Sequence, residues 1–175
     1  MKLISSSEIS RTSIFRVTFD RAIDPDGFEI KRAIVQHNGS AVMMPIDDRG
    51  RILLVRQYRL PARQYLWELP AGRIDEGETP LGAARRELAE ETGLRAKKWQ
   101  KLAVFYPSPG FLAEKMTIFV ASGLSSGDPT PMEDERIESR WFTSRELDEW
   151  IRKGKIRDGK TMIGFLRWKR YGASK

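Results

Sequence analysis

The segment 72–94 constrains the fold more than any other part of this 175-residue chain. Thr79 is a residue type that caps helix N-termini, and Pro80 suits the first helical position. Gly93 can adopt the left-handed conformation that ends a helix. We therefore predict a helix over residues 80–92, with strand-like segments on either side to pack against it.

Three glutamates crowd this predicted helix. Glu87, Glu90 and Glu91 stand three or four residues apart or side by side, so they share one helix face. Like charges at this spacing destabilise an isolated helix by roughly 0.2–0.5 kcal/mol per pair. A bound cation would reverse that sign, and hard cations such as Mg²⁺ commonly bridge carboxylates to phosphate oxygens. A solvated acidic face is the alternative for such a string taken alone.

The wider spacing resembles the signature of the Nudix hydrolase family, G-x5-E-x7-R-E-U-x-E-E-x-G-U, where U is apolar. Every specified position is filled, by Gly72, Glu78, Arg86, Glu87, Leu88, Glu90, Glu91, Gly93 and Leu94. The resemblance implies a loop-helix-loop that holds divalent cations against a nucleoside diphosphate linked to another moiety. It also implies that water hydrolyses the pyrophosphate bond.

The same resemblance implies roles for single residues. Glu87 and Glu91 are the expected metal ligands, with the Ala71 carbonyl as an additional ligand and Glu90 as a further ligand or base. The expected cation is Mg²⁺, with Mn²⁺ or another divalent ion as the alternative. Such a metal polarises a phosphoryl oxygen and lowers the pKa of a bound water.

The two remaining charged residues of the signature, Arg86 and Glu78, are expected to orient the helix and its loop.

Two acidic residues beyond the signature, Glu133 and Glu135, lie after a Pro-Thr-Pro break. In similar enzymes a glutamate on such a loop acts as general base or late metal ligand. By that analogy Glu133 is the base candidate and Glu135 the ligand candidate, with a solvated loop as the alternative.

Similarity to the ADP-ribose pyrophosphatase branch extends over LLVRQYR, ELPAGRIDEGE and YPSPGF. A proline about fifteen residues beyond the signature marks that branch, and Pro109 stands there. The implied reaction converts ADP-ribose to AMP and ribose 5-phosphate. Arg59 and Arg56 are candidates for the phosphates and terminal ribose, because guanidinium forks match phosphate geometry. Pro109 and Phe111 complete the candidate substrate-binding set.

The expected fold class is α+β, a Nudix-type α/β/α sandwich with a mixed central sheet and a small N-terminal antiparallel unit. Residues 1–38 would form that unit and residues 39–175 the catalytic domain. Similar enzymes use such an N-terminal sheet to dimerise and to complete the adenosine site, so a homodimer is expected. The predicted strands cover residues 14–22, 40–46, 51–58, 102–105, 116–121 and 137–142. Residues 40–46 and 51–58 are expected to form a hairpin. Two further helices are predicted over about 143–154 and 160–171.

Composition excludes several classes. The chain has no cysteine, which removes disulfide frameworks, thiolate zinc sites and cysteine nucleophiles. No stretch reaches the roughly 18 apolar residues of a membrane span, and no signal peptide is evident, so we expect a cytoplasmic protein without a membrane partner. The net charge of +7, taken alone, would favour a nucleic-acid partner. We expect none, because a basic surface around an acidic metal site can instead attract a small anionic nucleotide sugar.

One motif is a decoy. Residues 154–161 satisfy the P-loop expression G-x-x-x-x-G-K-T, but the preceding residues have helical spacing, so the loop would join two helices. His37 is the single histidine and is expected to be structural.

Three other functions stay open. Within the Nudix family, the substrate could be another nucleotide sugar or a dinucleotide. From different classes, the chain could be a non-catalytic ADP-ribose sensor or a nucleic-acid binder.

Overall fold

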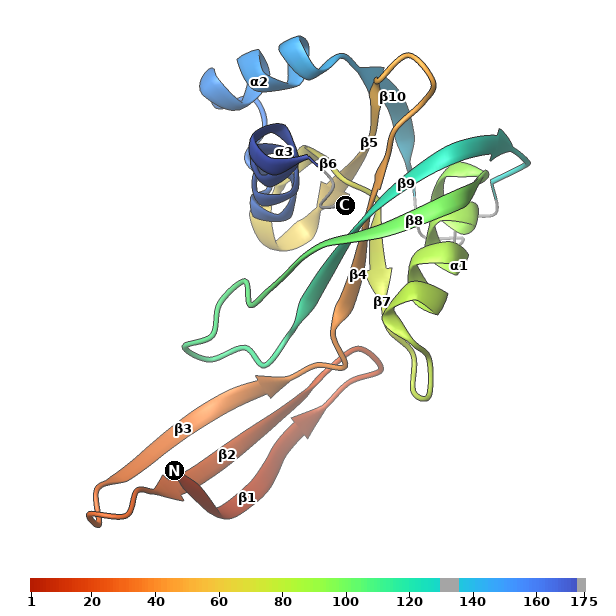
Figure 1. The fold of residues 1–175 in the computed structure, drawn as a ribbon. Coiled ribbons are helices and arrows are strands. Elements are labelled where there is room, and N and C mark those ends of the chain that lie inside the picture. Colours follow the sequence, from red (N-terminus) through yellow and green to blue (C-terminus); the bar gives the residue numbers. More distant parts are fainter. Residues whose placement is uncertain (130–135, 173–175) are drawn as a thin grey trace. The chain divides into compact units, whose positions relative to one another are not determined.

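The computed structural model describes residues 1–129 and 136–172, and it divides into two compact units. The first unit comprises residues 1–39 and 105–116, and the second comprises residues 40–104 and 117–175. The chain forms, in order, β1(Lys2–Arg11), β2(Arg16–Ile23), β3(Glu29–Gln36), β4(Ser40–Pro45), β5(Ile52–Arg59), a 3-10 turn η1(Leu60–Ala62), β6(Gln64–Glu68), β7(Ala71–Arg73), α1(Pro80–Thr92), β8(Leu94–Phe105), β9(Met116–Ser126), β10(Glu138–Phe142), α2(Ser144–Arg152) and α3(Gly159–Tyr171) (Figure 1).

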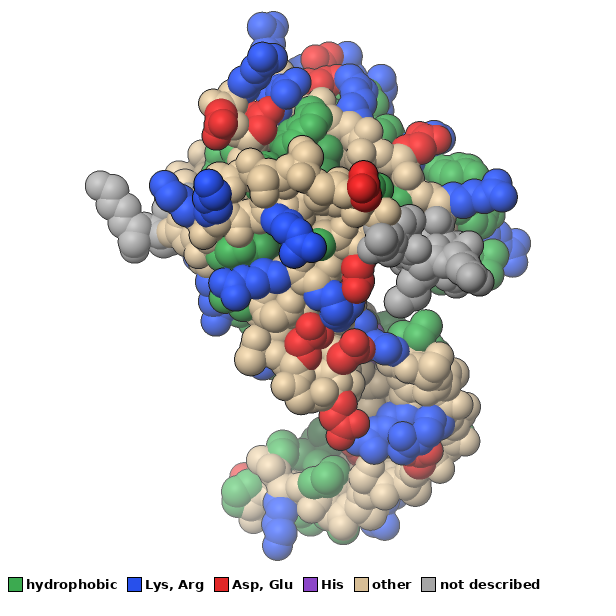
Figure 2. Space-filling model, turned by 90° about the vertical axis from the view of Figure 1, so that its right-hand side faces the viewer, with side chains coloured by type: hydrophobic (Ala, Val, Ile, Leu, Met, Phe, Trp, Pro, Cys, Tyr) green, Lys and Arg blue, Asp and Glu red, His purple; other side chains and the backbone are tan. Residues whose placement is uncertain are grey.

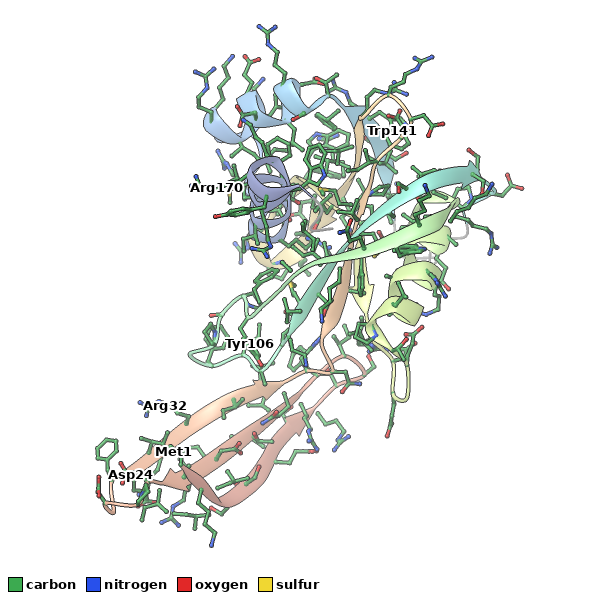
Figure 3. The ribbon with its side chains drawn as sticks, viewed as in Figure 1. Met1, Asp24, Arg32, Tyr106, Trp141 and Arg170 are labelled. Carbon is green, nitrogen blue, oxygen red and sulfur yellow. The ribbon has the colours of Figure 1, made fainter. Side chains whose placement is uncertain are left out.

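The first unit is an antiparallel sheet in the order β1-β2-β3. Its β2–β3 turn lies at Asp24, labelled in Figure 3, whose side chain accepts hydrogen bonds from the backbone N–H groups of Asp26 (3.0 Å) and Phe28 (2.9 Å). The segment 105–116 joins this unit through Val35, whose N–H donates to the Phe111 carbonyl at 2.8 Å. An Asx turn and strand pairing therefore organise this unit locally.

The second unit contains a four-stranded sheet, β7-β4-β9-β8, and a three-stranded sheet, β10-β5-β6. Helix α1 covers one face of the four-stranded sheet, and α2 and α3 lie on the other side (Figure 1). Strand alternation explains the layering: Phe119 packs with the α1 residues Ala84 and Leu88, whereas Ile118 lies beside Gly164 of α3. The fold is α+β with helices on both faces of a mixed sheet, as predicted.

The helix predictions are confirmed to within a residue or two. Thr79 accepts a hydrogen bond from the Gly82 N–H at the start of α1, and Gly93 ends it with φ +69°. Thr143 caps α2 in the same way, accepting from the Glu146 N–H at 3.2 Å.

The predicted hairpin of residues 40–46 and 51–58 is wrong beyond its turn. The turn itself forms, with the Gly50 N–H donating to the Asp47 carbonyl at 2.9 Å. After the single bridge Ile46↔Ile52, however, β4 pairs with β7 and β9 while β5 pairs with β6 and β10. All six residues of β4 are buried, so this strand has neighbours on both edges and both faces. The sequence pattern shows burial but does not reveal which strand is the partner.

Candidate active site

Helix α1 presents its acidic face to the short strand β7. The N–H of Ala71 donates to Glu91 Oε2 at 3.2 Å, and Glu91 is only 6% exposed. Glu87 lies against Gly72, where an added Cβ would stand 1.8 Å from the Glu87 carboxyl carbon. Glycine at 72 is therefore required for the carboxylate to approach the strand this closely. The structure thus brings together Glu87, Glu91 and the Ala71 backbone, three of the expected metal-site residues.

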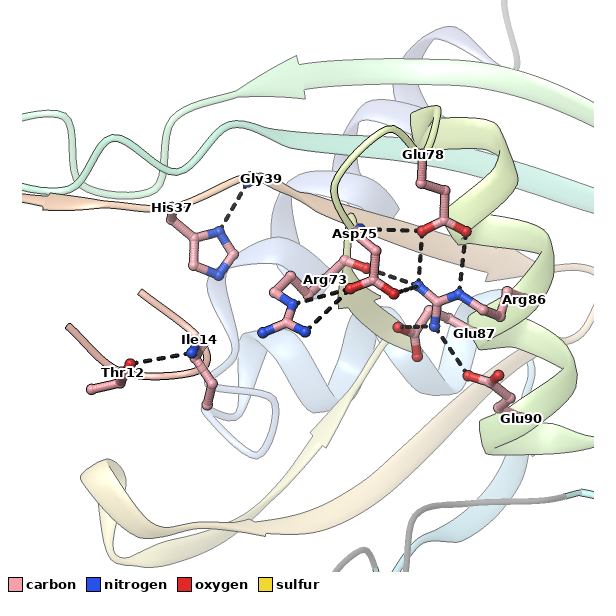
Figure 4. Close-up of polar contacts among 10 residues, drawn as sticks. All are labelled: Thr12, Ile14, His37, Gly39, Arg73, Asp75, Glu78, Arg86, Glu87 and Glu90. Atoms are coloured by element: carbon pink, nitrogen blue, oxygen red, sulfur yellow. Dashed lines mark hydrogen bonds and ion pairs between the residues drawn. The ribbon is translucent and has the colours of Figure 1, made fainter. Parts of the chain in front are cut away.

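Arg86 supplies a positive charge inside this acidic face (Figure 4). Its Nη1 donates to Glu87 Oε1 at 2.7 Å and to Glu90 Oε2 at 3.1 Å. Its Nη2 donates to the Arg73 carbonyl at 3.0 Å and to Glu78 Oε2 at 2.9 Å. Arg86 therefore neutralises part of the negative charge of these glutamates. The sequence alone had suggested a bound cation for that role.

The Glu78–Arg86 contact also ties the loop before α1 to the helix. The Asp75 N–H donates to Glu78 Oε2 at 3.2 Å, and Asp75 Oδ2 lies 3.6 Å from Arg86 Nη2. Hydrogen bonding from Arg86 lowers the pKa of Glu78, and the same bond raises the pKa of Arg86. The loop carboxylate thus stays ionised to well below neutral pH, and the strand, loop and helix are held as one piece.

We name Glu78, Arg86, Glu87, Glu90 and Glu91 the acidic helix cluster. Its carboxylates and the adjacent strand backbone are the oxygen donors that a hard divalent cation prefers, so the donor set fits such an ion. Among residues 1–129 and 136–172, no three acidic or histidine side chains converge closely enough to form a ready-made metal site. Glu87, Glu91 and the Ala71 carbonyl stay the predicted ligands of such an ion.

Arg59, at the end of β5, is held by a buried glutamate. Its Nε and Nη2 donate to the two carboxylate oxygens of Glu68 at 2.8 and 3.0 Å. Burial opposes the charge of Arg59, but the hydrogen bonds to Glu68 outweigh it and the pKa of Arg59 is raised, with Glu91 adding to the effect. Arg59 is therefore within electrostatic reach of the acidic helix cluster.

Arg56 occupies a different position on the same strand. Its guanidinium pairs with Glu138 at 3.1 Å and lies 4.7 Å from the centre of the Tyr65 ring. Because side chains alternate along a strand, Arg56 and Arg59 project from opposite faces of β5. The structure does not bring these two candidate substrate residues together.

The remaining candidates belong to the first unit or to residues that the structure does not describe. Pro109 and Phe111 belong to the first unit, where Phe111 is 55% exposed. Glu133 and Glu135 lie outside the described residues. His37 accepts a hydrogen bond from the Gly39 N–H at 3.0 Å, which stabilises the local turn.

Sequence reasoning missed Glu68, Lys160 and Asp158. The available signal was one glutamate among apolar neighbours in residues 66–69, and a lysine in the P-loop-like string. That string does join α2 to α3, as predicted, and its lysine pairs with Glu68.

Comparison with known proteins agrees with this geometry. The NUDIX domain family matches residues 36–163. An ADP-ribose pyrophosphatase of Bacillus subtilis (strain 168) is 35% identical over 168 residues, which cover 92% of this chain and 91% of that protein. A methanol dehydrogenase activator of Bacillus methanolicus is 35% identical over 164 residues, 93% of this chain and 89% of that protein.

The solved structure of an ADP compounds hydrolase has a similar fold, with a TM-score of 0.84 and 21% identity over 98% of this chain and 94% of the other. The family match covers well over half of the chain and includes every residue of the acidic helix cluster. The chain therefore belongs to the Nudix family.

Proposed function

We propose that this protein hydrolyses the pyrophosphate bond of ADP-ribose, with Mg²⁺ as cofactor, to give AMP and ribose 5-phosphate. The observation that carries the proposal is the contact of Glu87 and Glu91 with the backbone of Ala71 and Gly72. It gathers oxygen donors for a hard cation on one rigid strand-helix junction. The pyrophosphatase relative, which matches nearly the whole chain, supports ADP-ribose as substrate.

In this proposal, the residues of the acidic helix cluster have different roles. Glu87, Glu91 and the Ala71 carbonyl would hold the cation, and Arg86 would keep Glu87 and Glu90 in place. When bound, the cation polarises a phosphoryl oxygen and lowers the pKa of a coordinated water. Glu90, whose side chain is 38% exposed, can receive a proton from water at the edge of the cluster. Glu133 stays the base candidate and Glu135 the late-ligand candidate, with Glu90 as a further ligand or base.

Arg59 would bind the negative charge of the substrate pyrophosphate. A guanidinium presents five N–H donors, and Glu68 occupies two of them. The side chain is 40% exposed, so it can also meet a ligand from solvent. Arg56, Pro109 and Phe111 remain proposed contacts to the ribose and adenosine parts of the substrate.

A substrate panel tests the proposal. Turnover is measured with ADP-ribose, other nucleotide sugars, dinucleoside polyphosphates and nucleoside triphosphates at fixed Mg²⁺, and compared as kcat/KM. We expect ADP-ribose to exceed every other class by at least about tenfold, a selectivity that one or two well-placed polar contacts can supply. A higher kcat/KM for another nucleotide sugar or a dinucleotide would replace ADP-ribose by that substrate.

A second candidate function follows from the methanol dehydrogenase activator, which is as similar to this chain as the pyrophosphatase is. By that likeness, the protein would act on a partner protein. The ADP-ribose sensor, which binds ADP-ribose without hydrolysing it, is a separate alternative. Calorimetry together with product analysis separates these functions. Binding of ADP-ribose in Mg²⁺ with no release of AMP would favour the sensor.

We also propose that the first unit mediates a homodimer. All ten residues of β1 are exposed, and Leu3, Ile9 and Phe28 are 57%, 61% and 65% exposed in this unit. Exposed apolar side chains concentrated on a small sheet indicate a protein interface. Sedimentation of the wild type and of Ile9→Glu tests this, with a dimer expected for the wild type and a shift toward monomer for the variant. A monomeric wild type at micromolar concentration would refute it.

We propose that this protein has no nucleic-acid partner. On the face shown in Figure 2, lysine and arginine side chains are interspersed with aspartate and glutamate. Among the described residues, no helix is long and apolar enough to cross a membrane. A cytoplasmic location stays a prediction. Salt-dependent binding to DNA or RNA at physiological ionic strength would reopen the nucleic-acid function.

A further inference from the structure

Lys160 and Thr161, the last two residues of the P-loop-like string, lie in the first turn of α3 and bind other parts of the chain. The Lys160 ammonium donates to Glu68, and the Thr161 hydroxyl oxygen accepts a hydrogen bond from the Leu69 N–H at 2.7 Å. Gly164, one turn further along α3, lies so close to Leu69 that an added Cβ would stand 2.9 Å from its Cδ1. The start of α3 is thus fastened at three points to Glu68 and Leu69, just before strand β7.

Glu68 stands at the centre of a buried charge network formed by Arg59, Glu68, Asp158 and Lys160. Its side chain is 1% exposed, and that of Lys160 is 8% exposed. Glu68 Oε2 accepts from both Lys160 and Arg59 Nη2, while Oε1 accepts from Arg59 Nε. Asp158 accepts from the Lys160 ammonium at 2.9 Å. Two carboxylates and two cations thereby balance each other, with Glu68 and Lys160 buried and Arg59, whose side chain is 40% exposed, at the edge toward solvent.

The contacts of Glu68 determine the orientation of the Arg59 guanidinium. The glutamate takes two donors on one edge of the guanidinium, which fixes the plane and direction of the group. Lys160 approaches the same glutamate from α3, so the carboxylate that fixes Arg59 is itself fixed. Without the ammonium, Glu68 would be a buried carboxylate with fewer hydrogen bonds and could turn about its last bond.

We propose that Lys160 is a positioning residue that acts through Glu68 to orient the Arg59 guanidinium toward the substrate pyrophosphate. The inference rests on the proposed function, because it assigns Arg59 to the phosphates of ADP-ribose. Lys160 itself touches no substrate. It uses a buried ion pair, a kind of contact that often contributes little net stability, to fix the geometry of a binding group.

A double-mutant cycle on kcat/KM for ADP-ribose tests this. Arg59→Met should lower kcat/KM by about 100-fold, and Lys160→Met by about tenfold, mainly through a higher KM, because a displaced guanidinium binds phosphate less well. If Lys160 acts through Arg59, the double variant is no worse than Arg59→Met alone. Multiplied effects of the two substitutions, or an unchanged kcat/KM in a folded Lys160→Met protein, would overturn the proposal.

Two further variants separate positioning from folding. Lys169→Met removes a lysine of the same helix whose exposed side chain pairs with Asp148 at 2.7 Å, and it should leave kcat/KM unchanged. Lys160→Gln keeps a hydrogen-bond donor on a side chain one bond shorter, so it should lose less activity than Lys160→Met. If Lys160→Met does not fold, an unchanged kcat/KM in Lys160→Gln would overturn the proposal.

Nuclear magnetic resonance supplies a readout that needs no turnover. The Nε–H of Arg59 should give a slowly exchanging signal in the wild type and in Lys169→Met, because it is bound to a buried carboxylate. The signal should broaden or exchange faster in Lys160→Met. If the wild type fails to hydrolyse ADP-ribose, the proposed function falls, whereas an unchanged Arg59 signal in Lys160→Met would show that Lys160 does not position Arg59.

Discussion

Two groups of charged residues lie in the second unit, and they differ in where their members come from along the chain. The acidic helix cluster draws all its residues from the loop before α1 and from α1 itself. The buried charge network joins β5, β6 and the start of α3, with Glu68 and Lys160 separated by 92 positions. The first group therefore leaves a readable spacing in the sequence, whereas the second is assembled only when the sheet and α3 pack.

The two groups also differ in exposure and in the chemistry they can support. Glu90 in the acidic helix cluster is 38% exposed, while Glu68 in the buried charge network is 1% exposed. Partly open carboxylates can exchange an arginine contact for a metal ion, but a buried carboxylate with fixed partners cannot do so cheaply. We therefore assign metal chemistry to the first group and orientation of a binding group to the second.

The largest expected effect comes from the acidic helix cluster. Glu91→Gln and Glu87→Gln should each lower kcat on ADP-ribose by about 10³-fold, because a bound metal supplies several kcal/mol of transition-state stabilisation. Circular dichroism should show an unchanged fold. Retention of most activity by both variants in Mg²⁺ would remove these residues from the metal site.

Removal of one charge from the buried charge network should also lower stability. Lys160→Met should lower the free energy of unfolding by about 3 kcal/mol, because it leaves a buried carboxylate with one fewer counter-charge. Lys169→Met, which removes an exposed pair on the same helix, should cost less than about 1 kcal/mol. Denaturant unfolding measures both. Equal losses would mean that burial does not distinguish the two lysines.

Gly72 tests the contact between strand and helix. Gly72→Ala places a methyl group where the Glu87 carboxylate lies, so the carboxylate must move. A displacement of this size should reduce kcat by about 100-fold. Gly159→Ala adds the same methyl group where nothing lies within 4 Å, and its activity should match that of the wild type. Wild-type kcat in Gly72→Ala would show that the close approach is not needed.

The smallest effect concerns pH. Arg86 lowers the folded-state pKa of Glu78 below 4.5, so this pair contributes stability above that value and loses it as pH falls through the lowered pKa. Arg86→Met should lower Tm at pH 7, and the difference from wild type should shrink between about pH 5 and pH 3. Thermal unfolding across this range provides the measurement. A difference that stays constant with pH would exclude Glu78 as the titrating partner.

Features that depend on local contacts were predictable from the sequence, whereas features that depend on distant contacts were not. The bounds of α1 follow from Thr79 and Gly93, which act on their own neighbours. The split of β4 and β5 into two sheets was not predictable from their apolar pattern, because a buried strand does not encode its partner. Strand β8 begins at Leu94 and not near residue 102. Its first part was not predicted because charged residues interrupt the apolar pattern there and burial does not alternate regularly.

The site follows the same rule. The resemblance implies metal ligands at Glu87, Glu91 and the Ala71 carbonyl, and metal binding by them stays a prediction. The structure places Glu91 against the Ala71 N–H and Glu87 against Gly72. The motif could not predict that Arg59 would be held by Glu68 and indirectly by Lys160, because that chain of contacts depends on where α3 packs.

The most direct test is a Mg²⁺ titration of ADP-ribose hydrolysis by the wild-type protein, with EDTA as the zero point and products separated by chromatography. We predict no turnover in EDTA, a rate that rises and saturates with Mg²⁺, and AMP and ribose 5-phosphate in equal amounts. Undiminished hydrolysis in EDTA, or products other than these two, would contradict it.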